Sequence, residues 1–341
     1  MGLTVWSSTQ AEVPGTGTMR YISGLVHVPS NNDAFAAFLI FSWLAFLGCY
    51  LLYRAFVIAV PDGARYRYAK LLFLWPSLVL WPSSIGKESL MLLALGLAAL
   101  GAARLFTRRP GGYTLSLLGL GGAYFIRPHV AMIALVALVV ALIIGRGHAR
   151  PTGALTPASV AKVAAVCVLL AVMSVVATRT ADYLGVKSLH PSYTDVKFQE
   201  TRELTGEGGS RFFPADAASP VGYPQAAVTI LFRPFPFETN RLETFLTSIE
   251  ALGLALLTIV SWRRLLSVPW RLRVEPYVGF ALFYLLAFFF VFSVISNFGI
   301  LARERTMMLP FAFVLLSVTA LATSPEPRTA ESARSVQRPR R

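Results

Sequence analysis

The segment AFAAFLIFSWLAFLGCYLLYRAFVIAV (34–60) decides the fold class. It is longer than the roughly twenty apolar residues that a helix needs to cross a bilayer. Similar apolar runs recur as far as Thr323, separated by short connections that carry arginine. Because lipid offers no hydrogen-bond partners, such runs must close their backbone hydrogen bonds within helices. The pattern predicts an all-α, polytopic transmembrane helical bundle.

The composition agrees with this interpretation and excludes other classes. Apolar residues make up 55% of the chain, charged residues only 14%, and the mean hydropathy is +0.60, which is not typical of a water-soluble protein. The net charge of +14 does not indicate a nucleic-acid partner, because the basic residues lie between apolar segments rather than in one stripe. Cys49 and Cys167 lie within apolar runs, and no metal-binding motif occurs, so we expect no disulfide framework, metal or cofactor.

We predict about nine spans, in a first membrane block at 34–178 and a second at 244–323. The individual spans are expected at residues 34–60, 69–83, 88–105, 112–126, 129–146, 160–178, 244–262, 275–296 and 307–323. The fourth span is short, so the fourth and fifth segments have a second possible arrangement, a hairpin that does not fully cross. The alternation of charge along the chain favours full crossing.

The basic residues predict the orientation. If residues 1–33 lie outside, most of the 31 Lys and Arg residues fall on the cytoplasmic side, as the positive-inside rule requires. The N-terminus is therefore expected outside and the tail, 324–341, in the cytoplasm. Residues 1–33 lack the basic and apolar regions of a signal peptide, so we expect that the chain begins inside a longer protein with upstream helices.

One long extracytoplasmic loop is predicted at 179–243. Its first part is polar and rich in Gly and Pro, whereas 221–237 is apolar and aromatic, which predicts a short helix on the bilayer surface. The charged tail at 324–341 is expected to be disordered.

Unusual polar residues gather on the predicted outer side, beginning with WPSSIGKES (81–89). Ser83 or Ser84 is expected to cap the helix that follows, and Glu88 suits the positive end of its dipole. Lys87 opposes that dipole, so its position favours an anionic partner such as phosphate. For Glu88, a purely structural role at the start of the helix and a role in function are equally good interpretations.

Two further arginines lie at predicted outer turns. Arg127 precedes Pro128 and His129; it is either an anion ligand or a residue that reaches the lipid headgroups, whereas His129 is expected to pack within the turn. Arg233 and Glu238 lie in LFRPFPFE (231–238). The two prolines there would hold Arg233 in a fixed direction, as a recognition site needs, although interfacial aromatics can also simply anchor a helix.

Arg303 and Arg305 flank Glu304 just before the last predicted span. Two guanidiniums can present planar forks to a diphosphate, but an Arg–Glu–Arg network within the bundle is nearly as good an interpretation. The spacing of the acids in the long loop identifies no general base among them, and most are expected to be solvated surface charges. These acids are Asp182, Asp195, Glu200, Glu203, Glu207 and Asp216. Glu88, Glu238 and Glu304 lie closer to the expected site and are the candidate catalytic acids.

The run FLWPSLVLWPSSIGKESLMLL (73–93), the Arg127 turn and RERTMMLP (303–310) resemble bacterial multi-span polysaccharide polymerases and lipid-linked-sugar glycosyltransferases of the O-antigen-polymerase and EpsG-like groups. The resemblance covers about residues 40–320 in architecture, and its motifs are short. It implies a multi-pass protein of the bacterial plasma membrane that extends a glycan carried on a polyprenyl diphosphate at the outer face.

By this resemblance the donor diphosphate would be bound by the outer basic residues: Lys87, Arg127, Arg233, Arg303 and Arg305. Related glycosyltransferases often carry an acid in a first outer loop, where this chain offers only Glu12 and Asp33. If upstream helices are missing, the catalytic acid is missing with them, and the chain could be inactive.

Two alternatives come from other classes. A transporter or flippase of an anionic lipid-linked substrate would also need a basic outer cleft, but it is expected to show internal repeats and ionisable residues at membrane depth. A non-catalytic membrane protein is favoured if the outer arginines do not converge.

Overall fold

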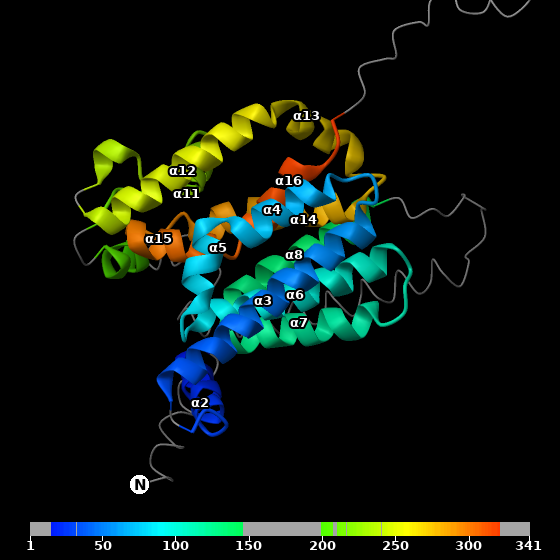
Figure 1. The fold of residues 1–341 in the computed structure, drawn as a ribbon. Coiled ribbons are helices and arrows are strands. Elements are labelled where there is room, and N and C mark those ends of the chain that lie inside the picture. The colour runs from blue at the N-terminus through cyan, green and yellow to red at the C-terminus, as the bar shows by residue number, and fades with distance from the viewer. Residues whose placement is uncertain are drawn as a thin grey trace, which may run out of the picture.

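The computed structural model describes residues 15–31, 33–145, 199–206, 210–215, 217–239 and 241–320. Within these ranges the chain folds into helices joined by turns, and its one β-type contact is an isolated bridge between Arg211 and Asn297. The prediction of an all-α fold is therefore confirmed. Most helices run roughly along one direction in a single bundle (Figure 1).

The first part of the bundle contains the elements α2 Thr16–His27, α3 Ala34–Ala59, α4 Arg65–Leu74, α5 Pro76–Leu80, the short 3-10 helix η1 Trp81–Ser83, α6 Lys87–Phe106, α7 Gly112–Ile126 and α8 Pro128–Ile144. Helices α3, α6 and α7 pack in that order, with α6 in the middle. Two glycines allow α3 and α6 to approach closely, because a Cβ on Gly48 would lie 2.5 Å from the Leu92 carbonyl oxygen and one on Gly96 2.5 Å from the Gly48 oxygen. Small residues at such crossings are typical of helix pairs in membranes.

The second part contains α11 Gly222–Phe232, η2 Pro236–Glu238, α12 Leu242–Val260, α13 Trp262–Arg271, α14 Pro276–Phe292, α15 Phe298–Arg305 and α16 Leu309–Ser317. Helix α14 joins the two parts, because it packs against both α8 and α16. Residues 199–205 are also helical and lie beside the turn before α15, where the Ser296 hydroxyl donates to the Arg202 carbonyl at 2.5 Å.

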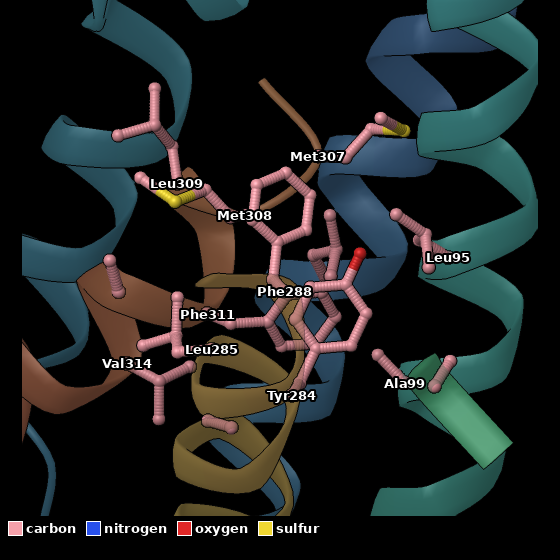
Figure 2. Packing of buried hydrophobic residues seen from close by; sticks show 14 of the residues in the cluster. Leu95, Ala99, Tyr284, Leu285, Phe288, Met307, Met308, Leu309, Phe311 and Val314 are labelled. Carbon is pink, nitrogen blue, oxygen red and sulfur yellow. The ribbon is translucent and has the colours of Figure 1, made fainter. Parts of the chain in front are cut away.

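The apolar core lies where α6, α14 and α16 meet. Figure 2 shows Tyr284 and Phe288 beside Phe311, with Leu95 and Ala99 facing them. The rings of Tyr284 and Phe311 have centroids 4.1 Å apart. Helix α15 ends only a few residues before Phe311. The packing of Phe311 therefore also restricts where α15 lies at one end of the bundle.

Three described helices are long and apolar enough to cross a membrane, namely α3, α6 and α12. Helices α13 and α14, bent by 112° relative to each other, add a fourth if the pair is counted as one span. Large apolar side chains such as Trp43 on α3 and Leu256 on α12 are exposed. Apolar helices with exposed apolar faces are compatible with the predicted membrane protein.

The count of about nine spans is not confirmed. The second expected span is divided between α4, α5 and η1, and the last corresponds to α16, which has only 9 residues. Helices α7 and α8 are apolar but shorter than a full span. The sixth expected span, 160–178, and the tail lie outside the described residues. Helix α11 covers most of the segment predicted to lie on the bilayer surface.

The two ends of the bundle differ in charge. At one end the α3–α4 turn meets the end of α16, where the Ala64 N–H donates to the Ser317 carbonyl at 2.8 Å. Arg67 and Arg264 lie there, because Arg67 contacts Ser261 and Arg264 donates to the Val318 carbonyl at 2.7 Å. We call this the basic end. The starts of α6 and α8 lie at the opposite end, which holds the candidate site.

Two glycines of α7, Gly119 and Gly121, differ in how closely neighbouring atoms approach them. A Cβ on Gly119 would collide with the Ala98 backbone nitrogen, whereas one on Gly121 meets nothing within 4 Å. Gly119→Ala should therefore push α6 and α7 apart and destabilise the protein by roughly 1–3 kcal/mol. Gly121→Ala should be neutral or stabilise by about 0.5–1 kcal/mol through its helix propensity. Thermal unfolding in detergent measures both, and equal midpoints would contradict the packing.

Candidate functional site

The start of α6 places Glu88 at the end of the bundle opposite the basic end. Gly86 is the N-cap residue, and no side chain caps the helix. The predicted cap by Ser83 or Ser84 is therefore wrong, because those hydroxyls donate to the carbonyls of the preceding turn instead. A Cβ on Gly86 would lie 2.7 Å from Glu88 Oε2, so the glycine leaves room for that carboxylate beside the helix end.

Arg127 ends α7 and is the N-cap residue of α8. Its side chain is buried, and its guanidinium forms an ion pair with Glu88 at 2.8 Å and a second with Glu304. Pro128 takes the first position of α8, where its missing N–H costs nothing. Arg127 therefore points into the bundle, and the alternative that it reaches outward to headgroups does not fit this geometry.

Helix α15 brings the other half of the site. The Asn297 side chain caps it by accepting from the Gly299 N–H at 2.9 Å. Near the other end of α15, Arg303 Nε lies 3.1 Å from Glu88 Oε1, and Arg303 Nη2 lies 3.8 Å from Glu304 Oε1. The Arg303 side chain remains 45% exposed, whereas both carboxylates are buried.

Glu88, Arg127, Arg303 and Glu304 thus form one group, which we call the charge cluster. It contains two carboxylates and two guanidiniums, so its formal charge is zero. A buried ion must keep its partner, because a lone charge in a low-dielectric interior is strongly unfavourable. The cluster therefore joins the starts of α6 and α8 to α15 and leaves one guanidinium, that of Arg303, partly open.

Lys87 and His129 lie beside the charge cluster. The Lys87 ammonium donates to the Thr16 hydroxyl at 3.2 Å, which ties the start of α2 to the start of α6. His129 lies within the electrostatic reach of Arg127 and Lys87. Its ring contacts Phe292, with centroids 5.6 Å apart, in keeping with the packing role expected for it.

Arg233 and Glu238 form a separate pair. Arg233 Nε lies 3.0 Å from Glu238 Oε1, and its guanidinium also lies over the rings of Phe212 and Phe298, 5.0 and 5.2 Å from their centroids. Burial favours the neutral form of Glu238, but the hydrogen bonds from Arg233 and the Phe235 N–H outweigh it and hold the pKa below its usual 4.5. Arg233 is fixed in direction, as predicted, but by partners of its own.

Arg305 does not act beside Arg303. Its side chain is buried and its guanidinium donates to the Arg233 carbonyl. Burial lowers its pKa to about 10, although the negative charge of Glu250 acts in the opposite direction. Residues two apart on a helix point about 200° away from each other, so the expectation that Arg303 and Arg305 present paired forks to one diphosphate is not met.

Glu250 is a polar residue that the sequence analysis missed. It lies within the apolar helix α12 and accepts a hydrogen bond of 2.5 Å from the Ser77 hydroxyl at the start of α5. An ionisable residue inside an apolar helix is often functional where such a helix crosses a membrane. The sequence feature that could have identified Glu250 is that it is an acid in the middle of the apolar run of α12.

The remaining acids lie away from the charge cluster or outside the described residues. Glu200 and Glu203 are in the helical residues 199–205. The others, Asp182, Asp195, Glu207 and Asp216, fall outside the described ranges. Among described residues, no group of three or more His, Cys, Asp or Glu side chains is arranged to hold a metal ion.

Comparison of the chain with protein-family models, curated proteins and solved structures gives no significant match. Function must therefore be argued from the site itself.

The two arginines of the charge cluster should differ in their effect on folding. Arg127→Gln leaves two buried carboxylates without their buried partner, which should cost roughly 3–5 kcal/mol of stability. Arg303→Gln removes a half-exposed contact and leaves Arg127 in place, so we expect a loss of about 1 kcal/mol or less. Thermal unfolding in detergent compares them, and a similar loss in both variants would refute the central role of Arg127.

The Arg233–Glu238 pair should make stability depend on pH. Because the pKa of Glu238 is lowered on folding, its contribution is present above the usual pKa of 4.5 and is lost as the pH falls through the lower folded value. Glu238→Gln should therefore lower the unfolding midpoint at pH 7 more than at pH 3. Glu243→Gln, which changes an exposed acid of α12, serves as the control, and an equal pH dependence in both variants would refute the pairing.

Proposed function

We propose that this chain is a membrane glycosyltransferase or polysaccharide polymerase that uses a polyprenyl-diphosphate-linked sugar donor at the outer face of the bacterial plasma membrane. The observation that carries this proposal is the convergence of Glu88, Arg127, Arg303 and Glu304. These residues come from three distant parts of the sequence and meet at the end of the bundle opposite the basic end. The resemblance to envelope polymerases, which rests on the same three segments, adds to it.

Within the charge cluster the residues would have different roles. Arg127 is buried between two carboxylates, so it would hold Glu88 and Glu304 in place rather than bind the donor itself. Arg303 is half exposed and contacts Glu88 through Nε. Its outer edge is therefore the part that a diphosphate oxygen would approach, and Lys87 at the adjacent helix start adds a second cation.

Binding of a diphosphate would exchange partners within the charge cluster. A diphosphate oxygen at the outer edge of the Arg303 guanidinium would compete with Glu88, which contacts Nε, for the positive charge of that group. As the acceptor hydroxyl oxygen bonds to the anomeric carbon, the bond from that carbon to the diphosphate oxygen breaks, and its electron pair leaves with the diphosphate. The hydroxyl proton passes to a carboxylate of the cluster, Glu88 or Glu304, or to the diphosphate. Fixed guanidiniums stabilise the charge that grows on the leaving group.

The proposal includes the membrane arrangement expected from the sequence, with about nine spans, the N-terminus outside and the C-terminus in the cytoplasm. In this arrangement membrane lipid surrounds the bundle, and a polyprenyl lipid in the same membrane carries the donor sugar. The arginines at the basic end, such as Arg67 and Arg264, support this orientation, because basic residues are enriched on the cytoplasmic side of membrane proteins. Arg233, Glu238 and Arg305 are assigned a supporting role, because their contacts bind α15 to the segment after α11.

A transporter or flippase of an anionic lipid-linked substrate is a second candidate, and one observation favours it. Glu250 lies inside an apolar helix and binds Ser77, which lies just after the break between α4 and α5. Carboxylates at membrane depth beside interrupted helices are typical of transport pathways.

The test uses Arg303→Lys in membranes supplied with a radiolabelled polyprenyl-diphosphate oligosaccharide and an acceptor glycan. The variant keeps the positive charge but loses the planar fork, so we expect polymer formation to fall by roughly 30- to 1000-fold, as for loss of one transition-state donor. Arg241→Lys, an exposed arginine before α12, is the control and should keep full activity.

Three outcomes separate the candidates. Polymer formed by the parent and lost in Arg303→Lys supports the transferase. Movement of labelled lipid across the bilayer without polymer, lost in Glu250→Gln, supports the transporter. Equal polymer synthesis by Arg303→Lys and the parent would refute the assigned role of Arg303.

A further inference from the structure

Helix α13 lies across the basic end of the bundle. It follows α12 after Ser261 and is bent by 112° from α14, the apolar helix that comes next. If α14 crosses the membrane, a segment at such an angle to it runs nearly parallel to the bilayer surface. The sequence, WRRLLSVPWR, combines two tryptophans with three arginines, a composition common in helices that lie in the interface.

The inner face of α13 is bound to the protein. Arg264 donates to the Val318 carbonyl at 2.7 Å, and Arg271 contacts both Glu275, at 2.5 Å, and Thr319. Ser267 is buried between them and donates to the Arg264 carbonyl at 2.6 Å. Both arginines therefore attach α13 to the end of α16, although the buried Arg271 Nε has no hydrogen-bond partner among the described residues.

The outer face carries an apolar stripe. Trp262, Leu266 and Trp270 are spaced by four residues and therefore lie along one side of the helix. They are 54%, 61% and 71% exposed. Exposed tryptophans and leucine in one line are unfavourable in water but suit the boundary between headgroups and acyl chains.

Two arginines flank this stripe on the exposed side. Arg263 is exposed and lies over the Trp262 ring, 5.5 Å from its centroid, and Arg273 is exposed just beyond the helix end. The nearest acid along the chain is Glu275, which Arg271 already binds. Asp62 also lies within electrostatic reach of Glu275, but within the described residues neither Arg263 nor Arg273 forms an ion pair. The outer face therefore presents two cations.

We propose that the outer face of α13 is a binding site for anionic phospholipids of the leaflet at the basic end. Trp262, Leu266 and Trp270 contact the acyl boundary, while Arg263 and Arg273 bind the headgroup phosphates. Charge and shape together favour lipid over a protein partner, because an apolar stripe flanked by arginines matches a negatively charged membrane surface. This site is independent of the function proposed for the opposite end.

The experiment uses the full chain in phosphatidylcholine vesicles that contain a small fraction of brominated phosphatidylcholine or brominated phosphatidylglycerol. Bromine quenches nearby tryptophans. With phenylalanine in place of the four tryptophans outside α13, in the parent and in every variant, the ratio of the two quenching curves gives the preference of α13 for the anionic lipid. The parent protein should prefer phosphatidylglycerol. Arg263→Gln with Arg273→Gln should reduce that preference by roughly fivefold for each arginine.

The control separates this site from the general charge of the basic end. Arg108→Gln with Arg109→Gln removes two exposed arginines from the turn between α6 and α7, the same change in charge away from α13. We expect this variant to keep the parent's preference. Equal quenching of the parent by both lipids, or an equal loss in the two double variants, would overturn the proposal.

Discussion

The structure depends most on the buried guanidinium of Arg127, which lies between the carboxylates of Glu88 and Glu304. A charge inside a membrane bundle is tolerated only when opposite charges hold it. Each of the three side chains therefore requires the other two. Since they come from α6, from the α7–α8 turn and from α15, one electrostatic requirement fixes three parts of the chain at the same end. The packing of Tyr284 against Phe311 fixes the position of α16, the helix that follows α15.

The sequence predicted only some of the residues that meet, because Arg233, Glu238 and Arg305 make contacts of their own, and it did not predict how the others pair. Charge counting placed Glu88, Arg127 and Arg303 on one side, because loops that alternate across a membrane are ordered by the positive-inside rule. Their pairing depends on distances between helices, which sequence spacing does not contain. The alternative of an Arg–Glu–Arg network at 303–305 is met only in part, because Arg303 Nη2 lies 3.8 Å from Glu304 Oε1 whereas Arg305 donates to the Arg233 carbonyl. Arg305 was misjudged because residues two apart on a helix face opposite ways.

The fold was predictable where apolar runs are unbroken and not where they are interrupted. Helices α3, α6, α7 and α8 begin and end within a few residues of the expected bounds. The second expected span is not one helix, because Pro76 is the first residue of α5 and Pro82 is the second residue of η1. Proline cannot continue the hydrogen bonding of a preceding turn. The amphipathic helix α13 was taken for a simple loop, because its arginines counted only as charge and their two faces were not separated.

The arginines of this protein differ in what an anion must do to bind them. On the outer face of α13, Arg263 and Arg273 form no ion pair within the described parts of the chain, so the proposed headgroup phosphate would displace no carboxylate there. In the charge cluster, an anion must compete with Glu88 for Arg303, and a singly charged anion gains little by replacing a carboxylate of equal charge. A diphosphate brings more charge and more acceptor oxygens, so it can compensate for the contact that it breaks. Under the proposed function, the neutral cluster would therefore bind a diphosphate in preference to a singly charged anion.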